Sequence, residues 1–158
     1  MAQLLRGPIC GSYVLILRLL TERSLRIGRL GVRCMPAGYY AYAGSALGPG
    51  GIVGRLRHHL RPAVRPHWHI DYLRGVAQIE QVWWGPGTLR REHDWAALLG
   101  CLPGATAPVP RFGASDCHCP THLFHFPEPP CLEAFRRLMR ERFPGVEEEL
   151  GELGGLRS

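Results

Sequence analysis

Three strand-like segments precede the first helix-like segment, and this order constrains the fold more than any other feature of the chain. Residues 12–20 are rich in Tyr, Val, Ile and Leu, which is typical of a buried strand. Residues 25–34 alternate in character and are predicted to form a second strand, bent at its glycines. Residues 38–44 alternate again, so Tyr40 and Tyr42 should share one face of a third strand.

The helices are predicted after these strands. A glycine-rich loop at 47–51 precedes a helix over 52–60, which Pro62 closes. The other expected elements are a short helix at 67–73, a strand at 76–84, a helix at 89–99 with Thr88 as N-cap and Gly100 as C-terminal stop, and a last helix from about Pro130. The order predicts an α+β fold with a small mixed or antiparallel sheet of three to four strands, flanked by helices.

The length of 158 residues suits one domain with a short appendage. We expect the folded body to span residues 8–127 and a helical extension to span 128–158. The longest apolar stretch is too short to cross a bilayer. The first residues lack the layout of a secretion signal, so we expect a cytoplasmic protein that does not associate with a membrane.

The charge is positive and unevenly distributed. The net charge is +6, and all 19 basic residues are Arg. Residues 1–127 carry 14 Arg against 6 acidic residues, whereas 128–158 carry 5 against 7, including the run 147–149 that we expect at the solvated end of the last helix. A basic body attracts polyanions, and guanidinium groups bind phosphate oxygens in pairs. The composition therefore favours a nucleic-acid partner.

Arg55 and His59 are one helical turn apart in the predicted helix 52–60, so their side chains should share a face. Arg55 can clamp a phosphate, and His59 can move a proton or donate a hydrogen bond near neutral pH. Arg57 and His58 point elsewhere around the same helix and could contact a nucleic-acid backbone. The alternative is an ordinary solvated helix face.

Several ordered blocks resemble known families. Gly11-Ser12-Tyr13, Tyr42-Ala43-Gly44 and Arg55-x-x-x-His59 resemble the GIY-YIG nuclease signature in degenerate form. The stretch 38–48 is similar to DUF123, a family related to the GIY-YIG nucleases and described as Uri-type endonuclease-like. Blocks at 67–73 and 112–124 extend the resemblance, which covers roughly residues 11–126.

The resemblance implies a GIY-YIG-like nuclease domain that hydrolyses phosphodiester bonds, with DNA favoured over RNA as substrate and with Mg²⁺ or Mn²⁺ as cofactor. The catalytic residues that it implies are Tyr13, Tyr42, Arg55, His59 and Glu92. Tyr13 would orient or deprotonate the attacking water, and Tyr42, with Tyr39 and Tyr40 as competing candidates, would lie beside the scissile phosphate. Glu92 would hold the metal, with Asp94 as its rival on the same predicted helix. A salt-bridged surface Glu92 is the alternative.

Nucleic-acid contacts are expected from five further residues: Ser45, Arg57, His58, His67 and His69. Two positions depart from the GIY-YIG pattern. Ser45 stands where many of these nucleases have Lys, and Gly113 stands where they have Asn, with Ser115 or Asp116 as possible substitutes. An inactive nucleic-acid-binding module of the same fold is therefore an alternative function.

Cys117, Cys119 and His122 have the ligand types and close spacing that suit Zn²⁺. His67 and His69 could complete a tetrahedral site, and Asp116 offers an alternative oxygen ligand. The other interpretations are an ordered polar loop, or an active-site loop in which His67, His69 or Asp71 contacts substrate. If zinc binds, a zinc-stabilised interaction domain is a third candidate function.

Overall fold

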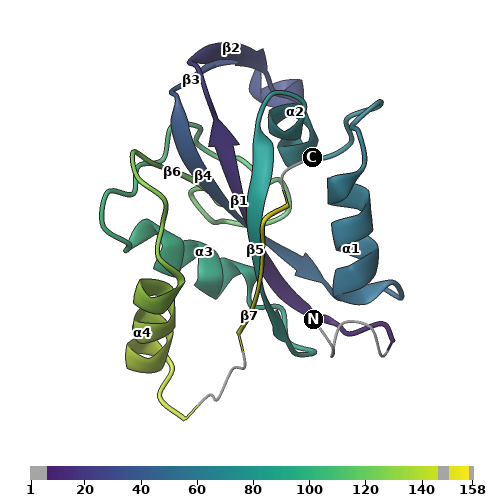
Figure 1. The fold of residues 1–158 in the computed structure, drawn as a ribbon, viewed down its shortest axis with the longest axis vertical. Helices are drawn as coiled ribbons and strands as arrows, with labels where there is room; N and C mark the ends of the chain where they lie inside the picture. Colours follow the sequence, from purple (N-terminus) through teal and green to yellow (C-terminus); the bar gives the residue numbers. More distant parts are fainter. Residues whose placement is uncertain (1–6, 146–149, 157–158) are drawn as a thin grey trace.

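The computed structural model of the chain describes residues 7–145 and 150–156 (Figure 1). Five antiparallel strands form the main sheet in the order β6-β4-β1-β5-β7. They are β1 (Gly11–Leu19), β4 (Gly38–Ala46), β5 (Gln78–Pro86), β6 (Leu123–Phe126) and β7 (Gly151–Gly154). A separate two-stranded sheet pairs β2 (Arg23–Arg26) with β3 (Val32–Met35). The helices are α1 (Gly51–Leu60), α2 (His69–Arg74), α3 (Glu92–Gly100) and α4 (Leu132–Arg142).

Strand β1 is the centre of the sheet. It pairs with β4 on one side and with β5 on the other, and all its residues except Arg18 are buried. Both faces of β1 are covered, which explains its nearly continuous apolar sequence. Successive side chains enter opposite cores, so Tyr13 belongs to one core and Val14 to the other.

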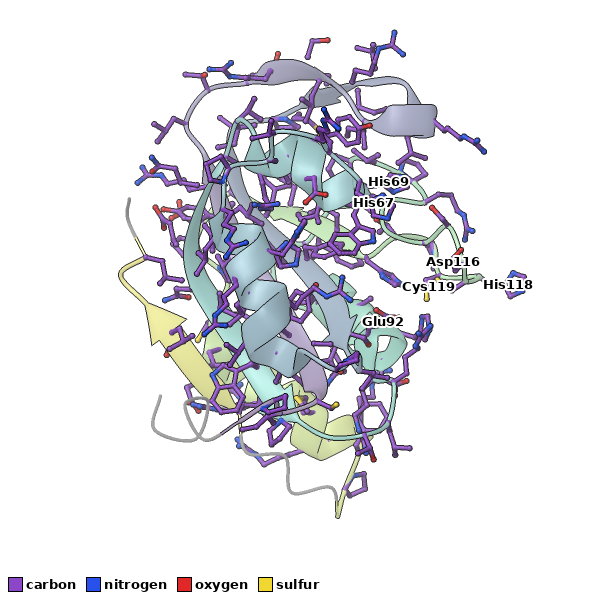
Figure 2. All side chains as sticks on the ribbon, turned by 90° about the vertical axis from the view of Figure 1, so that its right-hand side faces the viewer. His67, His69, Glu92, Asp116, His118 and Cys119 are labelled. Atoms are coloured by element: carbon purple, nitrogen blue, oxygen red, sulfur yellow. The ribbon has the colours of Figure 1, made fainter. Side chains whose placement is uncertain are left out.

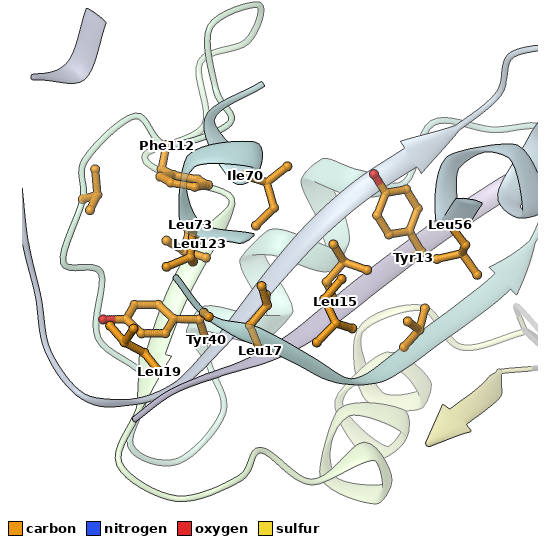
Figure 3. Close-up of a cluster of buried hydrophobic side chains, with 14 of the residues drawn as sticks. Tyr13, Leu15, Leu17, Leu19, Tyr40, Leu56, Ile70, Leu73, Phe112 and Leu123 are labelled. Carbon is orange, nitrogen blue, oxygen red and sulfur yellow. The ribbon is translucent and has the colours of Figure 1, made fainter. Parts of the chain in front are cut away.

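Each face of the sheet is covered by helices. Helices α1 and α2 cover one face, and α3 and α4 cover the other (Figure 1). Figure 3 shows the first core, where Tyr13, Leu15 and Leu17 of β1 meet Leu56, Ile70 and Phe112. In the second core the rings of Trp83 and Trp95 pack against Phe135 of α4. The α+β class predicted from the sequence is confirmed.

Two local predictions were wrong. Residues 25–34 do not form one strand, because positive φ angles at Gly28 (46°) and Gly31 (78°) turn the chain through a 3₁₀ turn into a hairpin. Helix α3 begins at Glu92, and its N-cap residue is Arg91 rather than Thr88. Strand β5 extends to Pro86, so residues 87–91 form the connection that leads the chain from the sheet to α3. The helix therefore begins later than predicted.

The main sheet has more strands than the three or four expected, because β6 and β7 add short edge strands. Each has four residues, too few for a clear alternation in the sequence. The described part of 128–158 thus contributes strand β7 as well as helix α4, and the division after residue 127 stays a prediction. Helix α4 ends at Arg142, and the acidic run 147–149 lies outside the described residues. In the part of the chain that the structure describes, no helix has the length and apolar character needed to cross a membrane.

Candidate functional site

A cleft of about 220 Å³ lies where β1, β4, α1 and α3 approach one another. The five residues expected at a catalytic site all line it: Tyr13, Tyr42, Arg55, His59 and Glu92. The other lining residues are Gly44, Ser45, Trp68, Arg90, His93, Gly113, Asp116, Cys117 and His122. The fold therefore brings together side chains that are far apart in the sequence. Figure 2 shows Glu92 on the same side of the molecule as Asp116 and Cys119.

Two glycines make room for the tyrosines. Gly44 lies opposite Tyr13 in the β1–β4 register, and a Cβ there would be 2.5 Å from Cζ and Oη of Tyr13. Gly113 has a φ of +68°, and a Cβ there would be 2.9 Å from Cε2 of Tyr42. Any larger residue at Gly113 would have to displace the Tyr42 ring and adopt a strained backbone conformation.

Tyr13 and His59 form a buried pair, with 2.8 Å between Tyr13 Oη and His59 Nε2. Burial, reinforced by the nearby charges of Arg74 and His58, lowers the pKa of His59 to about 3. Burial likewise raises the pKa of Tyr13 well above its usual value. Both groups are therefore neutral near pH 7, and they share a hydrogen bond between uncharged partners. Among the described residues, His59 Nδ1 has no hydrogen-bond partner.

Tyr42 faces the cleft, whereas its two competitors do not line it. Its ring contacts Phe112 edge-to-face at a centroid distance of 6.0 Å. Burial, with a smaller contribution from the negative charge of Glu92, raises the pKa of the Tyr42 phenol. The Tyr40 hydroxyl instead donates to the Pro36 carbonyl at 2.6 Å, and the Tyr39 ring lies under Arg18.

Arg55 is held in place by an aromatic ring. Its Cζ lies 4.4 Å from the centroid of the Trp68 ring, a cation–π contact. Stacking uses the flat face of the guanidinium group, so the N–H donors at its edge can still bind an anion. Trp68 was not predicted as a functional residue, although an aromatic residue between His67 and His69 is a usable signal of such a contact.

Glu92 supplies a carboxylate to the cleft. Its side chain is 16% exposed, and Oε1 lies 3.7 Å from Nε of Arg90 and 3.9 Å from Nε2 of His93. Asp94, its rival, is exposed and is not among the residues that line the cleft. Of the two candidates on this helix, Glu92 is thus the one that lines the cleft, and Asp116 supplies a second carboxylate to the lining.

The residues expected to contact nucleic acid are divided among several places. Ser45 lines the cleft, and its buried Oγ has no hydrogen-bond partner within the described residues. Arg57 is exposed on α1 and does not line the cleft. His67 and His69 line a separate hollow of about 450 Å³, where His69 Nδ1 accepts the backbone N–H of Gly113 at 2.8 Å.

His58 is exposed and does not line the cleft, but its ring contacts the buried carboxylate of Asp71, which is the centre of a hydrogen-bond network. One Asp71 oxygen accepts the backbone N–H groups of His67 and Trp68, and the other accepts from Arg74 at 2.6 Å and from His58 at 3.2 Å. Burial opposes the charge on Asp71, but these hydrogen bonds outweigh it and lower the pKa of the carboxyl. Because the network joins α1 to α2, it sets the position of Trp68 beside Arg55.

A second group of side chains borders the cleft and has metal-ligand character. One donor atom each from His93, Cys117, Cys119 and His122 lies within 4.8 Å of the others. The predicted ligands Cys117, Cys119 and His122 are thus brought together, but the fourth member is His93. His67 and His69 were the wrong candidates for completing it, and Asp116 lines the cleft outside this group.

His58, His59 and Asp71 form another cluster of similar dimensions. It is poorly suited to a cation, because the Arg74 guanidinium already binds the Asp71 carboxylate and His59 Nε2 is already paired with the Tyr13 hydroxyl.

Together these features define an α+β protein with a polar cleft and residues that could hold a metal ion. Residues 12–143 match the family described as domain of unknown function DUF123, and the chain belongs to that family. Neither the curated proteins nor the solved structures gave a match.

Proposed function

We propose that this protein is a metal-dependent endonuclease of the GIY-YIG type that hydrolyses phosphodiester bonds in DNA. The observation that carries the proposal is the convergence of Tyr13, Tyr42, Arg55, His59 and Glu92 on one cleft. Phosphodiester hydrolysis needs a positioned water, positive charge at the non-bridging oxygens and assistance to the leaving oxygen. The cleft offers groups suited to each of these tasks.

The donor set fits Mg²⁺ or Mn²⁺. Glu92 supplies hard carboxylate oxygens. Its contacts with Arg90 and His93 are 3.7 and 3.9 Å long, so they are weak and a metal cation could replace them. A single carboxylate suits Mg²⁺, which retains several water ligands, and the cleft has room for them. Bound at Glu92, the metal would neutralise phosphate charge and make a water molecule more acidic.

The side chains of the chain itself position the substrate. Arg55, fixed by Trp68, binds the non-bridging oxygens, and the unpaired Ser45 Oγ donates a further hydrogen bond. Tyr13 keeps its phenolic proton and orients the attacking water. The 2.8 Å contact with the neutral His59 imidazole holds the Tyr13 hydroxyl in position for this role. The cytoplasm is the proposed location, since the six cysteines are all free.

A specific observation favours a second candidate, a nucleic-acid-binding module that has lost the chemistry. Ser45 and Gly113 replace the Lys and Asn of the GIY-YIG pattern, and Ser45 contributes no charge to the cleft. Such a module would bind nucleic acid through Arg55 and the basic surface without cutting it.

A plasmid-nicking assay separates the two candidates. Wild-type protein should convert supercoiled plasmid to open circles only with Mg²⁺ or Mn²⁺, and Glu92→Gln should reduce the rate by about 100-fold or more. Asp94→Asn is the matched control, because Asp94 is an exposed carboxylate on the same helix and should leave the rate within about twofold. Plasmid binding in a gel shift without nicking would identify the binding module instead, and neither binding nor nicking would refute both.

A further inference from the structure

We propose that His93, Cys117, Cys119 and His122 bind one Zn²⁺ in a closed, four-ligand site that fastens the first turn of α3 to the loop before β6. The inference rests on the arrangement of these side chains and is independent of the chemistry proposed for the cleft. It assigns zinc and the metal at Glu92 to different donor sets.

The four donor atoms lie close to the spacing of a tetrahedral site, within small side-chain adjustments. His93 Nδ1 lies 3.0 Å from Cys119 Sγ, His122 Nε2 lies 3.5 Å from Cys117 Sγ, and all four atoms lie within 4.8 Å of one another. Zinc bonds of about 2.0–2.3 Å place tetrahedral ligands roughly 3.3–3.8 Å apart. Two thiolates and two imidazoles also form a set that prefers zinc to magnesium.

The burial of His122 favours a metal over a set of simple hydrogen bonds. The residue is 2% exposed, and its ring nitrogen faces a cysteine sulfur, which is a weak hydrogen-bonding partner. The second imidazole, His93, likewise faces a sulfur. A thiol forms only a weak hydrogen bond with an imidazole, so these pairs stabilise the two rings little. The same arrangement of two thiols and two imidazoles is what a Cys₂His₂ metal site requires.

The loop that carries the cysteines is organised by Arg111. This residue adopts a left-handed φ of 66°, and its guanidinium donates to the carbonyls of Ala114, Cys117 and Cys119 at 2.5–2.7 Å. The backbone of both cysteines is therefore held from one side. His118, between them, points outward from the loop (Figure 2).

Zinc would complete the attachment of α3. Within the described residues, the helix N-terminus has no side-chain capping hydrogen bond from its N-cap position, and His93 is the second residue of the helix. With four protein ligands the zinc has no open position for a substrate, so its role is structural. The bond from zinc to His93 would fix the first turn of α3 and with it the preceding residue, Glu92, at the edge of the cleft.

The test measures metal content and coordination rather than activity. Full-length protein purified without chelators should contain about one zinc ion per chain. After replacement by Co²⁺, it should show the intense visible absorption of a tetrahedral site together with thiolate charge-transfer bands. Cys119→Ser and His93→Ala should each weaken metal binding at least about tenfold. His118→Ala and Cys131→Ser are the matched controls and should retain zinc, because both residues are exposed and lie outside the cluster.

The outcomes are decisive even if a variant fails to fold, because the cobalt spectrum is recorded on wild-type protein. An octahedral spectrum, or zinc below about a tenth of an equivalent with both thiols reduced, would overturn the site. Full zinc affinity in folded His93→Ala would overturn the four-ligand geometry. Glu92→Gln should keep its zinc, so loss of nicking in that variant tests the nuclease proposal alone.

Discussion

Replacement of Asp71 by Asn tests whether the buried network sets the geometry between α1 and α2. Asp71 is 1% exposed, and its two oxygens accept four hydrogen bonds, including one from the Arg74 guanidinium. An amide has one acceptor oxygen, so its NH₂ group would face either Arg74 or two backbone N–H donors. The Arg74 side chain, 4% exposed, would lose its buried counter-charge.

Removing one partner of a buried ion pair typically costs about 3–5 kcal/mol. Arg74 would still donate to the backbone carbonyls of His58, His59 and Arg61, so we expect the lower value, about 3 kcal/mol at pH 7. For a chain of this size, the corresponding fall in Tm is about 6–12 °C. The exposed Asp94→Asn control should change the free energy of unfolding by less than about 0.5 kcal/mol.

Urea unfolding of the three proteins between pH 7 and pH 2.5 supplies the measurement. The native network lowers the pKa of Asp71, so its contribution to stability is complete above the unfolded value of about 3.9 and is lost as pH falls through the lower folded value. The difference between wild type and Asp71→Asn should therefore shrink below about pH 4. A difference under about 1 kcal/mol at pH 7, or one that does not shrink in acid, would refute this account of the network.

Three further predictions concern the cleft. Gly44→Ala should destabilise the protein by about 1–3 kcal/mol in urea unfolding, because its Cβ would overlap the Tyr13 ring, whereas Gly54→Ala, in open space on α1, should not. Tyr13→Phe should lower the free energy of unfolding by about 1–3 kcal/mol, since it leaves His59 Nε2 buried without its partner; an unchanged value would contradict the hydrogen bond. The His59 imidazole should stay neutral down to about pH 3, so its NMR resonances should not shift between pH 8 and pH 5. Because the unfolded chain gains a proton at His59 below its pKa of about 6.5, the free energy of unfolding should decline as pH falls below that value. A titration midpoint near pH 6.5 for His59 in the folded protein would show that the ring is solvated.

The parts of the fold that could be predicted from the sequence are the long segments whose own hydrophobic pattern identifies them as a strand or a helix. Residues 12–20 form a long apolar run, 38–44 and 52–60 are long enough to display a clear period, and β1, β4 and α1 follow these segments closely. The four-residue strands β6 and β7 do not, and their formation depends on pairing with β4 and β5. The position of Tyr13 near Tyr42 was predictable because both motifs lie on strands, and the β1–β4 register places Gly44 opposite Tyr13.

The missed residues are those whose roles depend on long-range contacts. Nothing in the local pattern around His93 separates it from a solvated helical histidine, because its partner Cys119 lies 26 residues away. His67 and His69 have the same chemistry and lie in a block that resembles the family, yet the fold turns them toward a different hollow. Residue type and spacing therefore predicted which kinds of side chain gather in the candidate metal cluster, and tertiary packing determined which histidine joins it.

The start of α3 shows how one helical turn can serve two sites with different chemistry. Consecutive residues in an α-helix point about 100° apart, so Glu92 and His93 cannot project in the same direction. Both residues line the cleft, but Glu92 lies near the Arg90 guanidinium, whereas His93 Nδ1 meets the sulfur of Cys119. Hard oxygen donors and soft thiolates select different cations, so the two proposed metals need not compete although their ligands are adjacent. The contact of 3.9 Å between His93 Nε2 and Glu92 Oε1 joins the two sites, and a zinc-bound imidazole would orient the carboxylate that it faces.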